Sequence, residues 1–268
     1  MKIVFVGAGN MAEAIVSGLL KSKIAQPNEV CLVDISELRL NTLAEKYGVE
    51  TSLNTADSVQ SADVVILSIK PQIFPSVWGE ITESIHPEAL VVSIMAGVPA
   101  SKIEEGNSLR VVRVMPNTPA LVGEGAAGVA GGARATEADL LWSEKLLGSV
   151  GLAVRVEENE LDAVTALSGS GPAYVFYWIE SMLDAVNEMG LEKNLSRELA
   201  LQTIIGAATL MKNSDETAEQ LRAKVTSKGG TTAAAIETME KNGVKASIIA
   251  ALFAARDRSV ELAEESRK

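Results

Sequence analysis

The first eighteen residues restrict the fold of this chain more than any other stretch. A short apolar, mostly β-branched run from Ile3 to Val6 stops at Gly7, and the motif Gly7-x-Gly9-x-x-Ala12 follows at once. A helical apolar pattern then begins, and this order of strand, glycine turn and helix is typical of a dinucleotide-binding site. Gly7 permits the sharp turn, Gly9 lets a pyrophosphate approach the backbone, and Ala12 lets the helix pack closely on the strand. The alternative is a tight turn that binds nothing.

Strand and helix patterns then alternate as far as residue 160. Apolar runs predict further strands at 29–33, 63–69, 89–94, 110–114 and 153–156, with helices at 36–47, 73–85, 98–105 and 136–147 between them. The glycine-rich segment 123–132 is interpreted as a strand at the edge of the sheet rather than as a second phosphate loop. Repeated strand–helix units predict a doubly wound parallel sheet. The loops that follow its strands should gather at one edge and bind the ligand there.

No convincing strand pattern follows residue 160. Helical patterns occupy 162–167, 173–189, 195–212, 217–225, 233–242 and 246–267. We therefore expect two domains, a dinucleotide-binding domain over residues 1–160 and a helical domain over residues 161–268. The second half has more apolar surface than a small bundle needs, which favours self-association. The alternative is that this surface is buried against the first domain.

The composition excludes several classes of function. The formal net charge of −11 does not favour binding to nucleic acid or to an anionic membrane. The single cysteine, Cys31, lies in an apolar run and cannot form an internal disulfide, which suits the cytoplasm. The single histidine, His86, precedes Pro87 and is expected in a surface loop. We therefore expect no metal site and no catalytic histidine, and the sequence shows neither a leader peptide nor a membrane span.

The cofactor's adenosine end is expected at Asp34, which ends the second predicted strand. A carboxylate there accepts hydrogen bonds from the ribose hydroxyls and repels a 2′-phosphate, which favours NAD over NADP. Arg39, five residues further on, could still meet a phosphate, so both NADH and NADPH remain candidates. Asp34 could also serve only as a turn or N-cap residue.

Two other segments combine hydroxyl or amide groups with a restrained backbone. In the segment 115–119 (MPNTP), two prolines hold Asn117 rigidly, which suits either the orientation of a nicotinamide ring or a stiff interstrand loop. In the segment 226–232 (TSKGGTT), backbone N–H groups before a helix could form an anion cradle for a substrate carboxylate. Thr232 could instead act only as the N-cap of that helix. A third segment, 168–172 (SGSGP), is either a packing kink or a pocket wall.

These segments together resemble a known family. The sequences VGAGNMA, IKP, RVMPNTPALVGEG, LSGSGPAYVF and VTSKGGTT occur in the order and at the distances found in pyrroline-5-carboxylate reductases, over essentially the whole chain. The resemblance implies an N-terminal Rossmann-like sheet followed by an all-α dimerisation domain. It implies NAD(P)H-dependent reduction of Δ1-pyrroline-5-carboxylate to L-proline in homodimers or rings of dimers, with an active site shared by two subunits.

The resemblance also assigns roles to individual residues. The cofactor would be bound by Val6, Gly7, Ala8, Gly9, Asn10, Met11, Asp34, Asn54, Ile69, Lys70, Pro71, Met95, Ala96 and Asn117. The substrate would contact Glu158, Ser227, Gly230, Thr231 and Thr232, with the Thr232 hydroxyl on the ring nitrogen as the catalytic group. Three departures from the family pattern bear on these roles. Many members have proline in place of Lys228 and a small polar or uncharged residue in place of Lys224, and some have serine or threonine in place of Asp34.

Two other functions are compatible with parts of the pattern. A β-hydroxyacid dehydrogenase would carry a catalytic lysine on a helix of the second domain, where Lys212 is the nearest candidate. A non-catalytic nucleotide-sensing protein would explain the lack of a conventional acid–base residue. Two assays separate these functions: oxidation of NADH and NADPH with Δ1-pyrroline-5-carboxylate, and reduction of NAD⁺ and NADP⁺ with a hydroxyacid in the reverse direction.

Overall fold

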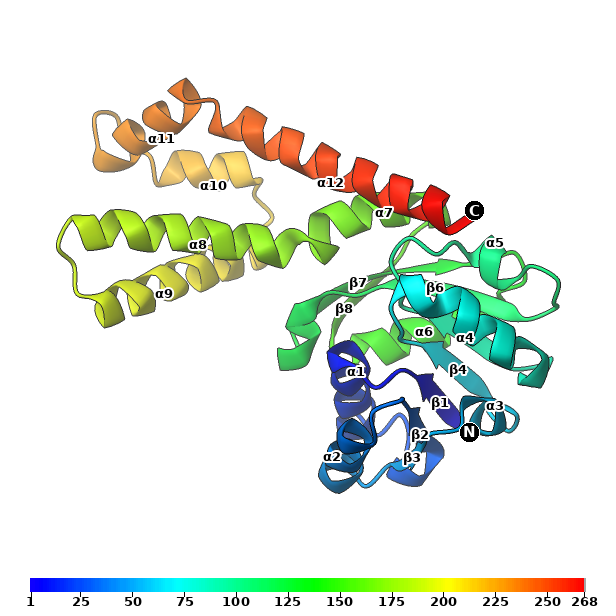
Figure 1. Cartoon of the computed structure of the whole chain (residues 1–268). Coiled ribbons are helices and arrows are strands. Elements are labelled where there is room, and N and C mark those ends of the chain that lie inside the picture. Colours follow the sequence, from blue (N-terminus) through cyan, green and yellow to red (C-terminus); the bar gives the residue numbers. More distant parts are fainter. Residues whose placement is uncertain (268) are drawn as a thin grey trace. The chain divides into compact units, whose positions relative to one another are not determined.

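The computed structural model describes residues 1–267 and divides into two compact units (Figure 1). The first unit comprises residues 1–172 and the end of the chain from Ala254, and the second comprises residues 173–253. Lys268, the last residue of the predicted helical domain, lies outside the described residues. The predicted boundary at residue 160 separates strands from helices rather than compact units, and it stays a prediction.

The first unit is built on one eight-stranded sheet in the order β3-β2-β1-β4-β5-β6-β7-β8. All neighbouring strands are parallel except β6 and β7, which are antiparallel. The first six strands therefore have the order 3-2-1-4-5-6 of a Rossmann-type sheet, which confirms the predicted fold class. The strands are β1 (Ile3–Val6), β2 (Val30–Val33), β3 (Glu50–Ser52), β4 (Val64–Leu67), β5 (Leu90–Ser93), β6 (Arg110–Met115), β7 (Gly125–Gly131) and β8 (Gly151–Arg155).

Two helices of the first unit, α2 and α6, begin at residue types that favour helix ends. Ser36 caps α2 by accepting a hydrogen bond from the Arg39 N–H, and Gly48 ends this helix in the left-handed conformation. Thr136 and Asp139 form a capping box at the start of α6. The helices are α1 (Asn10–Lys21), α2 (Glu37–Tyr47), α3 (Thr55–Val59), α4 (Phe74–Ile81), α5 (Ala100–Ile103), α6 (Glu137–Gly148) and α7 (Leu161–Val164).

Two apolar clusters cover the two faces of the sheet. Ile3 and Phe5 of β1 belong to one cluster and Val4 and Val6 to the other, because successive side chains of a strand point to opposite faces. All four are buried. Burial on both faces explains why the parallel strands have continuous apolar sequences instead of an alternating pattern.

The glycine-rich segment is a strand, but its predicted edge position is wrong. β7 pairs with β6 on one side and with β8 on the other, so β8 forms the edge. The small residues of β7 have a packing role. A Cβ on Gly128 would lie 3.0 Å from the Val164 side chain and 3.1 Å from that of Leu161, so glycine lets α7 lie close to the strand. The short strand β3 was not predicted.

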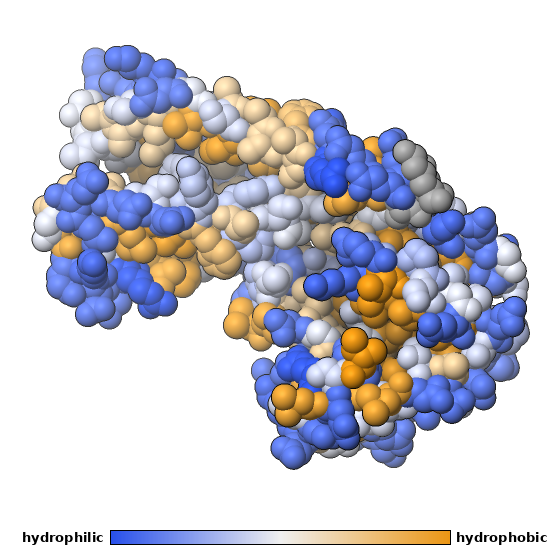
Figure 2. Space-filling view, in the orientation of Figure 1, coloured by the Kyte–Doolittle hydropathy of each residue, from blue (hydrophilic) through white to orange (hydrophobic). Residues whose placement is uncertain are grey.

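The second unit contains helices only, as predicted. α8 (Gly171–Glu188) begins at the boundary, followed by α9 (Lys193–Lys212), α10 (Ala218–Lys224), α11 (Thr231–Lys241) and the start of α12 (Val244–Arg267). Large apolar side chains are exposed on several of these helices, among them Phe176, Tyr177, Leu199, Ile205 and Phe253. Figure 2 shows apolar residues on the visible surface of these helices. Among residues 1–267, none of the helices combines the length and apolar character that crossing a membrane requires.

The end of the chain belongs to the first unit. In the second half of α12, Ser259 is buried and its hydroxyl donates a 2.7 Å hydrogen bond to Asp162 of α7. Gly97 lies against the same helix, and a Cβ there would be 3.2 Å from the Cβ of Leu262. The chain therefore leaves the first unit at residue 172 and re-enters it at residue 254.

Candidate functional site

The glycine loop lies at the point where the strand order reverses, between β1 and β4. Gly7 has φ +99°, and its N–H donates a 2.8 Å hydrogen bond to the Val33 carbonyl. The Ser68 hydroxyl, after β4, donates to the Gly7 carbonyl at 2.7 Å. Ligands of doubly wound sheets bind at this reversal, outside the carboxyl ends of the strands.

Space and free donors for a pyrophosphate are present at the start of α1. Gly9 is the N-cap of α1 and provides no side-chain cap, so the first N–H groups of the helix remain available. An added Cβ on Gly9 would meet nothing within 4 Å. An uncapped helix N-terminus beside open space fits a phosphate group.

The strand register brings the other predicted cofactor segments to the same edge. Val6 pairs with Val33 and Leu67, and Leu67 with Ser93, so Asp34, the segment 69–71 and the segment 95–96 all follow neighbouring strand ends. The side chains of Val6, Ala8 and Met95 are buried, so only their backbone atoms can face a ligand. The exposed residues are Gly9, Asn10, Asn54 and Lys70, and the partly exposed ones are Gly7, Met11, Asp34, Ile69, Pro71 and Ala96. Asn54 also caps α3 through its side chain.

Asn117 has two structural partners. Its Oδ1 accepts a 2.8 Å hydrogen bond from the Ala126 N–H of β7, and its Nδ2 donates a 3.0 Å bond to the Ser168 carbonyl. Ser168 lies in a π-helical turn, Thr165–Gly169, which overlaps the segment 168–172 that was predicted to be a packing kink or a pocket wall. π-turns occur often at functional sites because they expose backbone groups. The Asn117 side chain therefore fixes this turn, and its predicted contact with the nicotinamide stays a prediction.

Glu158, the predicted substrate-proximal acid, lies in an ion pair. Its Oε1 accepts hydrogen bonds from Arg113 at 3.0 Å and from the Ala100 N–H at 2.7 Å. Arg113 comes from β6 and Ala100 from the start of α5, so Glu158 joins two neighbouring strand–helix units. Arg113 was not predicted as a site residue, because nothing local in the sequence links it to a residue 45 positions away.

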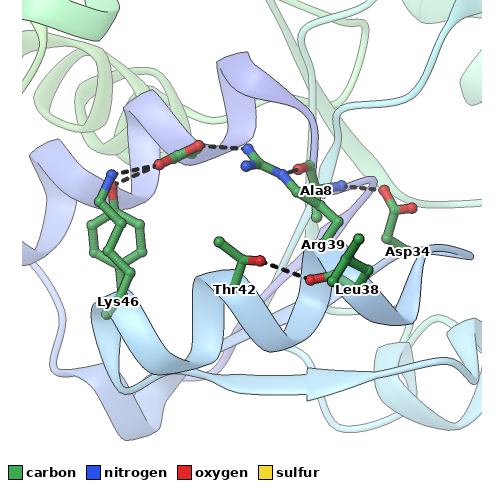
Figure 3. A network of polar contacts seen from close by, with 8 residues as sticks. Ala8, Asp34, Leu38, Arg39, Thr42 and Lys46 are labelled. Atoms are coloured by element: carbon green, nitrogen blue, oxygen red, sulfur yellow. Dashed lines mark hydrogen bonds and ion pairs between the residues drawn. The ribbon is translucent and has the colours of Figure 1, made fainter.

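A polar cluster joins α1 to α2 beside the glycine loop (Figure 3). Glu13 accepts hydrogen bonds from Lys46 at 2.9 Å, from the Tyr47 hydroxyl at 3.1 Å and from Arg39 at 2.5 Å. These bonds, the one from Lys46 foremost, lower the pKa of the Glu13 carboxyl from 4.5 to about 2 against the opposing effect of partial burial. Glu13 was not singled out from the sequence, although its place in the first turn of the fingerprint helix marks it as near the ligand.

Glu13 should therefore contribute stability that depends on pH. Its folded pKa lies below the unfolded value, so the stabilisation is complete above about pH 5 and is lost as pH falls toward 2. We expect Glu13→Gln to lower the free energy of unfolding by about 1–3 kcal/mol at pH 7, and by less than about 1 kcal/mol at pH 2.5. Urea unfolding at both pH values measures the difference. The control is Glu45→Gln, the same substitution at an exposed position of α2. An equal loss of stability in Glu13→Gln at both pH values would contradict the expectation.

The predicted substrate residues form one loop of the second unit. Gly230 is the N-cap of α11, which begins at Thr231, so the alternative in which Thr232 is the N-cap is wrong. Gly229 has φ +73°, and the Gly230 N–H bonds the Ser227 carbonyl at 3.0 Å. An added Cβ on Gly230 would lie 2.5 Å from the Ser227 hydroxyl oxygen. Ser227 and Thr231 are exposed and Thr232 partly so, which leaves this uncapped helix start open to an anion.

The remaining features of the described residues do not suggest another centre. Among residues 1–267 there is no group of three or more side chains placed to hold a metal ion. Cys31 is buried in β2 and His86 lies exposed in a loop, as predicted. A cavity of about 480 Å³ lies near the starts of β4, β5 and β6, lined by Asp63, Leu90 and Arg110 among others. It is at the opposite edge of the sheet from the glycine loop.

Comparison with known proteins assigns both halves of the chain. Residues 158–262 match the family described as "Pyrroline-5-carboxylate reductase dimerisation", and residues 2–97 match "NADP oxidoreductase coenzyme F420-dependent". The chain is 40% identical to the pyrroline-5-carboxylate reductase of Methanosarcina acetivorans, with 98% of each chain covered.

Solved structures agree with this assignment. The Coxiella burnetii pyrroline-5-carboxylate reductase superposes with a TM-score of 0.89 at 37% identity, covering 97% of this chain and 98% of that one. The Plasmodium falciparum pyrroline carboxylate reductase, solved with NADP bound, superposes with a TM-score of 0.90 at 32% identity, covering 98% of both chains. The chain therefore belongs to the pyrroline-5-carboxylate reductase family.

Proposed function

We propose that this chain reduces Δ1-pyrroline-5-carboxylate to L-proline with NADH or NADPH, the final step of proline biosynthesis. The observation that carries the proposal is the likeness to named reductases over almost the entire length of both chains. The glycine loop supports it independently, because its open N-cap at the strand reversal fits a dinucleotide.

The cofactor would supply the hydride when bound, and this chain's residues would hold and orient it. The backbone from Val6 to Met11 would take the pyrophosphate, and Asp34 and Asn54 the adenosine ribose. The segments 69–71 and 95–96 would line the cofactor, with Asn117 near the nicotinamide end. Backbone contact suits Val6, Ala8 and Met95, whose side chains are buried.

The substrate carboxylate would bind at the start of α11. Ser227 and Thr231 would hold it through hydroxyl and N–H groups. Gly230, whose own N–H donates to the Ser227 carbonyl, would let the carboxylate approach the backbone closely. The Thr232 hydroxyl would hydrogen-bond the ring nitrogen. Glu158 would lie near the substrate, with Arg113 balancing its charge. A protonated imine is already electrophilic, so the protein needs to position it, exclude water and provide a partner for the ring N–H. Such a reaction needs no histidine or cysteine.

The assembly would be a homodimer or a ring of dimers. The family match over 158–262 supports an oligomer, and the exposed apolar side chains of the second unit are compatible with a covered surface. The active site would then be shared by two subunits. The cytoplasm is the proposed location, supported by the single, buried cysteine.

The two competing functions have less support. Lys212, the candidate lysine of a β-hydroxyacid dehydrogenase, ends α9 and is exposed, away in sequence from the hydroxyl-rich loop. A purely nucleotide-sensing protein would not need the open helix start at Gly230. The deciding experiment measures oxidation of NADH and NADPH with and without the cyclic imine Δ1-pyrroline-5-carboxylate. The proposal fails if neither cofactor is oxidised in an imine-dependent way, and oxidation of a hydroxyacid would favour the dehydrogenase.

Replacing Thr232 by alanine should impair the reaction without unfolding the protein. The hydroxyl would be lost from the ring nitrogen, and we expect kcat/KM to fall by about tenfold or more. Thr232→Ser should restore most of the activity. The control is Thr226→Ala in the same loop, whose hydroxyl bonds the Arg222 carbonyl at 2.6 Å. A Thr232→Ala value within about threefold of wild type, under ~0.7 kcal/mol, would remove Thr232 from the mechanism.

A further inference from the structure

The carboxylate of Asp34 is fixed against the glycine loop. Its Oδ2 accepts a 2.8 Å hydrogen bond from the Ala8 N–H, and its Oδ1 accepts a 3.0 Å bond from the Ser36 N–H. Both oxygens keep further lone pairs, since a carboxylate can accept about four hydrogen bonds. A negative charge is thereby held rigidly at the end of β2, where the adenosine ribose of a bound dinucleotide would lie.

Arg39 is the nearest cation on α2, and it is held by two other groups. Its Nε donates a 2.8 Å hydrogen bond to the Ala8 carbonyl, and its Nη2 contacts Glu13 at 2.5 Å. Figure 3 shows the guanidinium lying between the loop at Ala8 and helix α1. Glu13 also pairs with Lys46, so one carboxylate is the ion-pair partner of both basic residues of α2.

A 2′-phosphate would meet an unfavourable environment here. It carries close to two negative charges at neutral pH and needs unpaired cations or a rigid arginine fork. Asp34 would repel the phosphate. The Nε and Nη2 groups of Arg39 already donate to the Ala8 carbonyl and to Glu13. The ribose hydroxyls of an unphosphorylated cofactor, by contrast, can donate to Asp34.

We propose that Glu13 and Asp34 together make the adenosine end selective for an unphosphorylated ribose, so that this enzyme prefers NADH to NADPH. In this arrangement Glu13 is a specificity-determining residue that acts through Arg39, because it keeps the guanidinium from turning toward a 2′-phosphate. The inference concerns the binding of the cofactor. It rests on the proposed function only in naming the reaction that uses the bound cofactor.

Binding to the full-length protein tests the inference without turnover. The dissociation constants of NADH and NADPH are measured by cofactor fluorescence, and 5′-AMP and adenosine 2′,5′-bisphosphate serve as competitors. We expect NADH to bind at least about tenfold more tightly than NADPH, and 5′-AMP to compete better than the bisphosphate. Equal or tighter binding of NADPH would overturn the inference.

Variants separate the contributions of the two carboxylates. Glu13→Gln should raise the affinity for NADPH relative to NADH by about tenfold, because Arg39 becomes free to pair with a phosphate. Adding Arg39→Gln to this variant should abolish the gain. Asp34→Asn should raise relative NADPH affinity independently, by removing the repulsion. Tyr47→Phe is the matched control, since it removes one hydrogen bond to Glu13 without changing any charge, and its ratio should stay within about twofold of wild type.

Two results would contradict the role of Glu13: an unchanged ratio in Glu13→Gln, or a gain that persists in the double variant. If Glu13→Gln is poorly folded, Asp34→Asn still tests whether a negative charge at this site repels the 2′-phosphate. Failures of the inference and of the proposed function are distinguishable. If the cofactor is oxidised in an imine-dependent way but NADPH is preferred, only the inference is contradicted. If NADH clearly binds more tightly but neither cofactor is oxidised in an imine-dependent way, only the proposed function is contradicted.

Discussion

Replacing Gly7 by alanine is expected to lower the free energy of unfolding by about 3 kcal/mol or more. Gly7 has φ +99°, a conformation that side chains with a Cβ rarely adopt. The added Cβ would lie 2.6 Å from the Ser68 carbonyl oxygen and 2.9 Å from its carbon, which are backbone atoms at the end of β4. Neither atom can move aside without disturbing the pairing of β1 with β4.

Thermal unfolding of the cofactor-free protein measures this effect, and a drop in Tm of about 10 °C corresponds to it. Gly9→Ala is the matched comparison in the same loop. Its Cβ meets nothing within 4 Å and its φ is −68°, so folding should be unaffected. The new methyl group would occupy the space of the pyrophosphate, and NADH binding should weaken by about tenfold or more. Equal stability of Gly7→Ala and wild type would show that the turn tolerates a side chain.

Replacing Asn117 by alanine is expected to cost about 2–4 kcal/mol of stability, because two backbone groups lose their partner. The Ala126 N–H and the Ser168 carbonyl would both remain without the bonds of 2.8 and 3.0 Å that the amide provides. The side chain is only 8% exposed, so water cannot easily replace it. Thr118→Ala, at the exposed neighbouring position, should change stability by less than about 0.5 kcal/mol.

The same variant distinguishes the two roles considered for Asn117. If it fixes the π-turn at Thr165–Gly169, Asn117→Ala loses stability in the cofactor-free protein, as urea unfolding would show. If it serves only to contact the nicotinamide, stability is retained and only the kinetics of the reaction change. Retained stability would therefore contradict the structural role.

Local sequence signals predicted most of the fold. Ser36 and Gly48 mark the ends of α2, and the apolar runs locate the parallel strands, because capping and burial act on neighbouring residues. Glu50–Ser52 escaped prediction because three residues are too few to show a pattern. β7 lies inside the sheet because β8 pairs with its free edge. The glycine- and alanine-rich sequence of β7 does not indicate whether another strand pairs there.

The parts of the candidate site that are formed by backbone atoms could be predicted from the sequence. Gly7 and Gly9 can be assigned from spacing, since a turn and an open approach require residues without a Cβ. The partners of the polar side chains could not be assigned in this way. Asn117 bonds a residue 51 positions away, and Arg39 bonds Ala8 and Glu13 across the first two strand–helix units. Such pairs depend on the tertiary packing and leave no periodic signal.

The return of α12 to the first unit affects how the chain can fold during synthesis. Domains usually fold in order from the N-terminus as they leave the ribosome. The sheet can follow that order, but the hydrogen bond between Asp162 and Ser259 joins residues 97 positions apart. Residues 173–253 must be made before this contact is possible. The first unit of a nascent chain therefore stays incomplete until the second half of α12, including Ser259, has been translated.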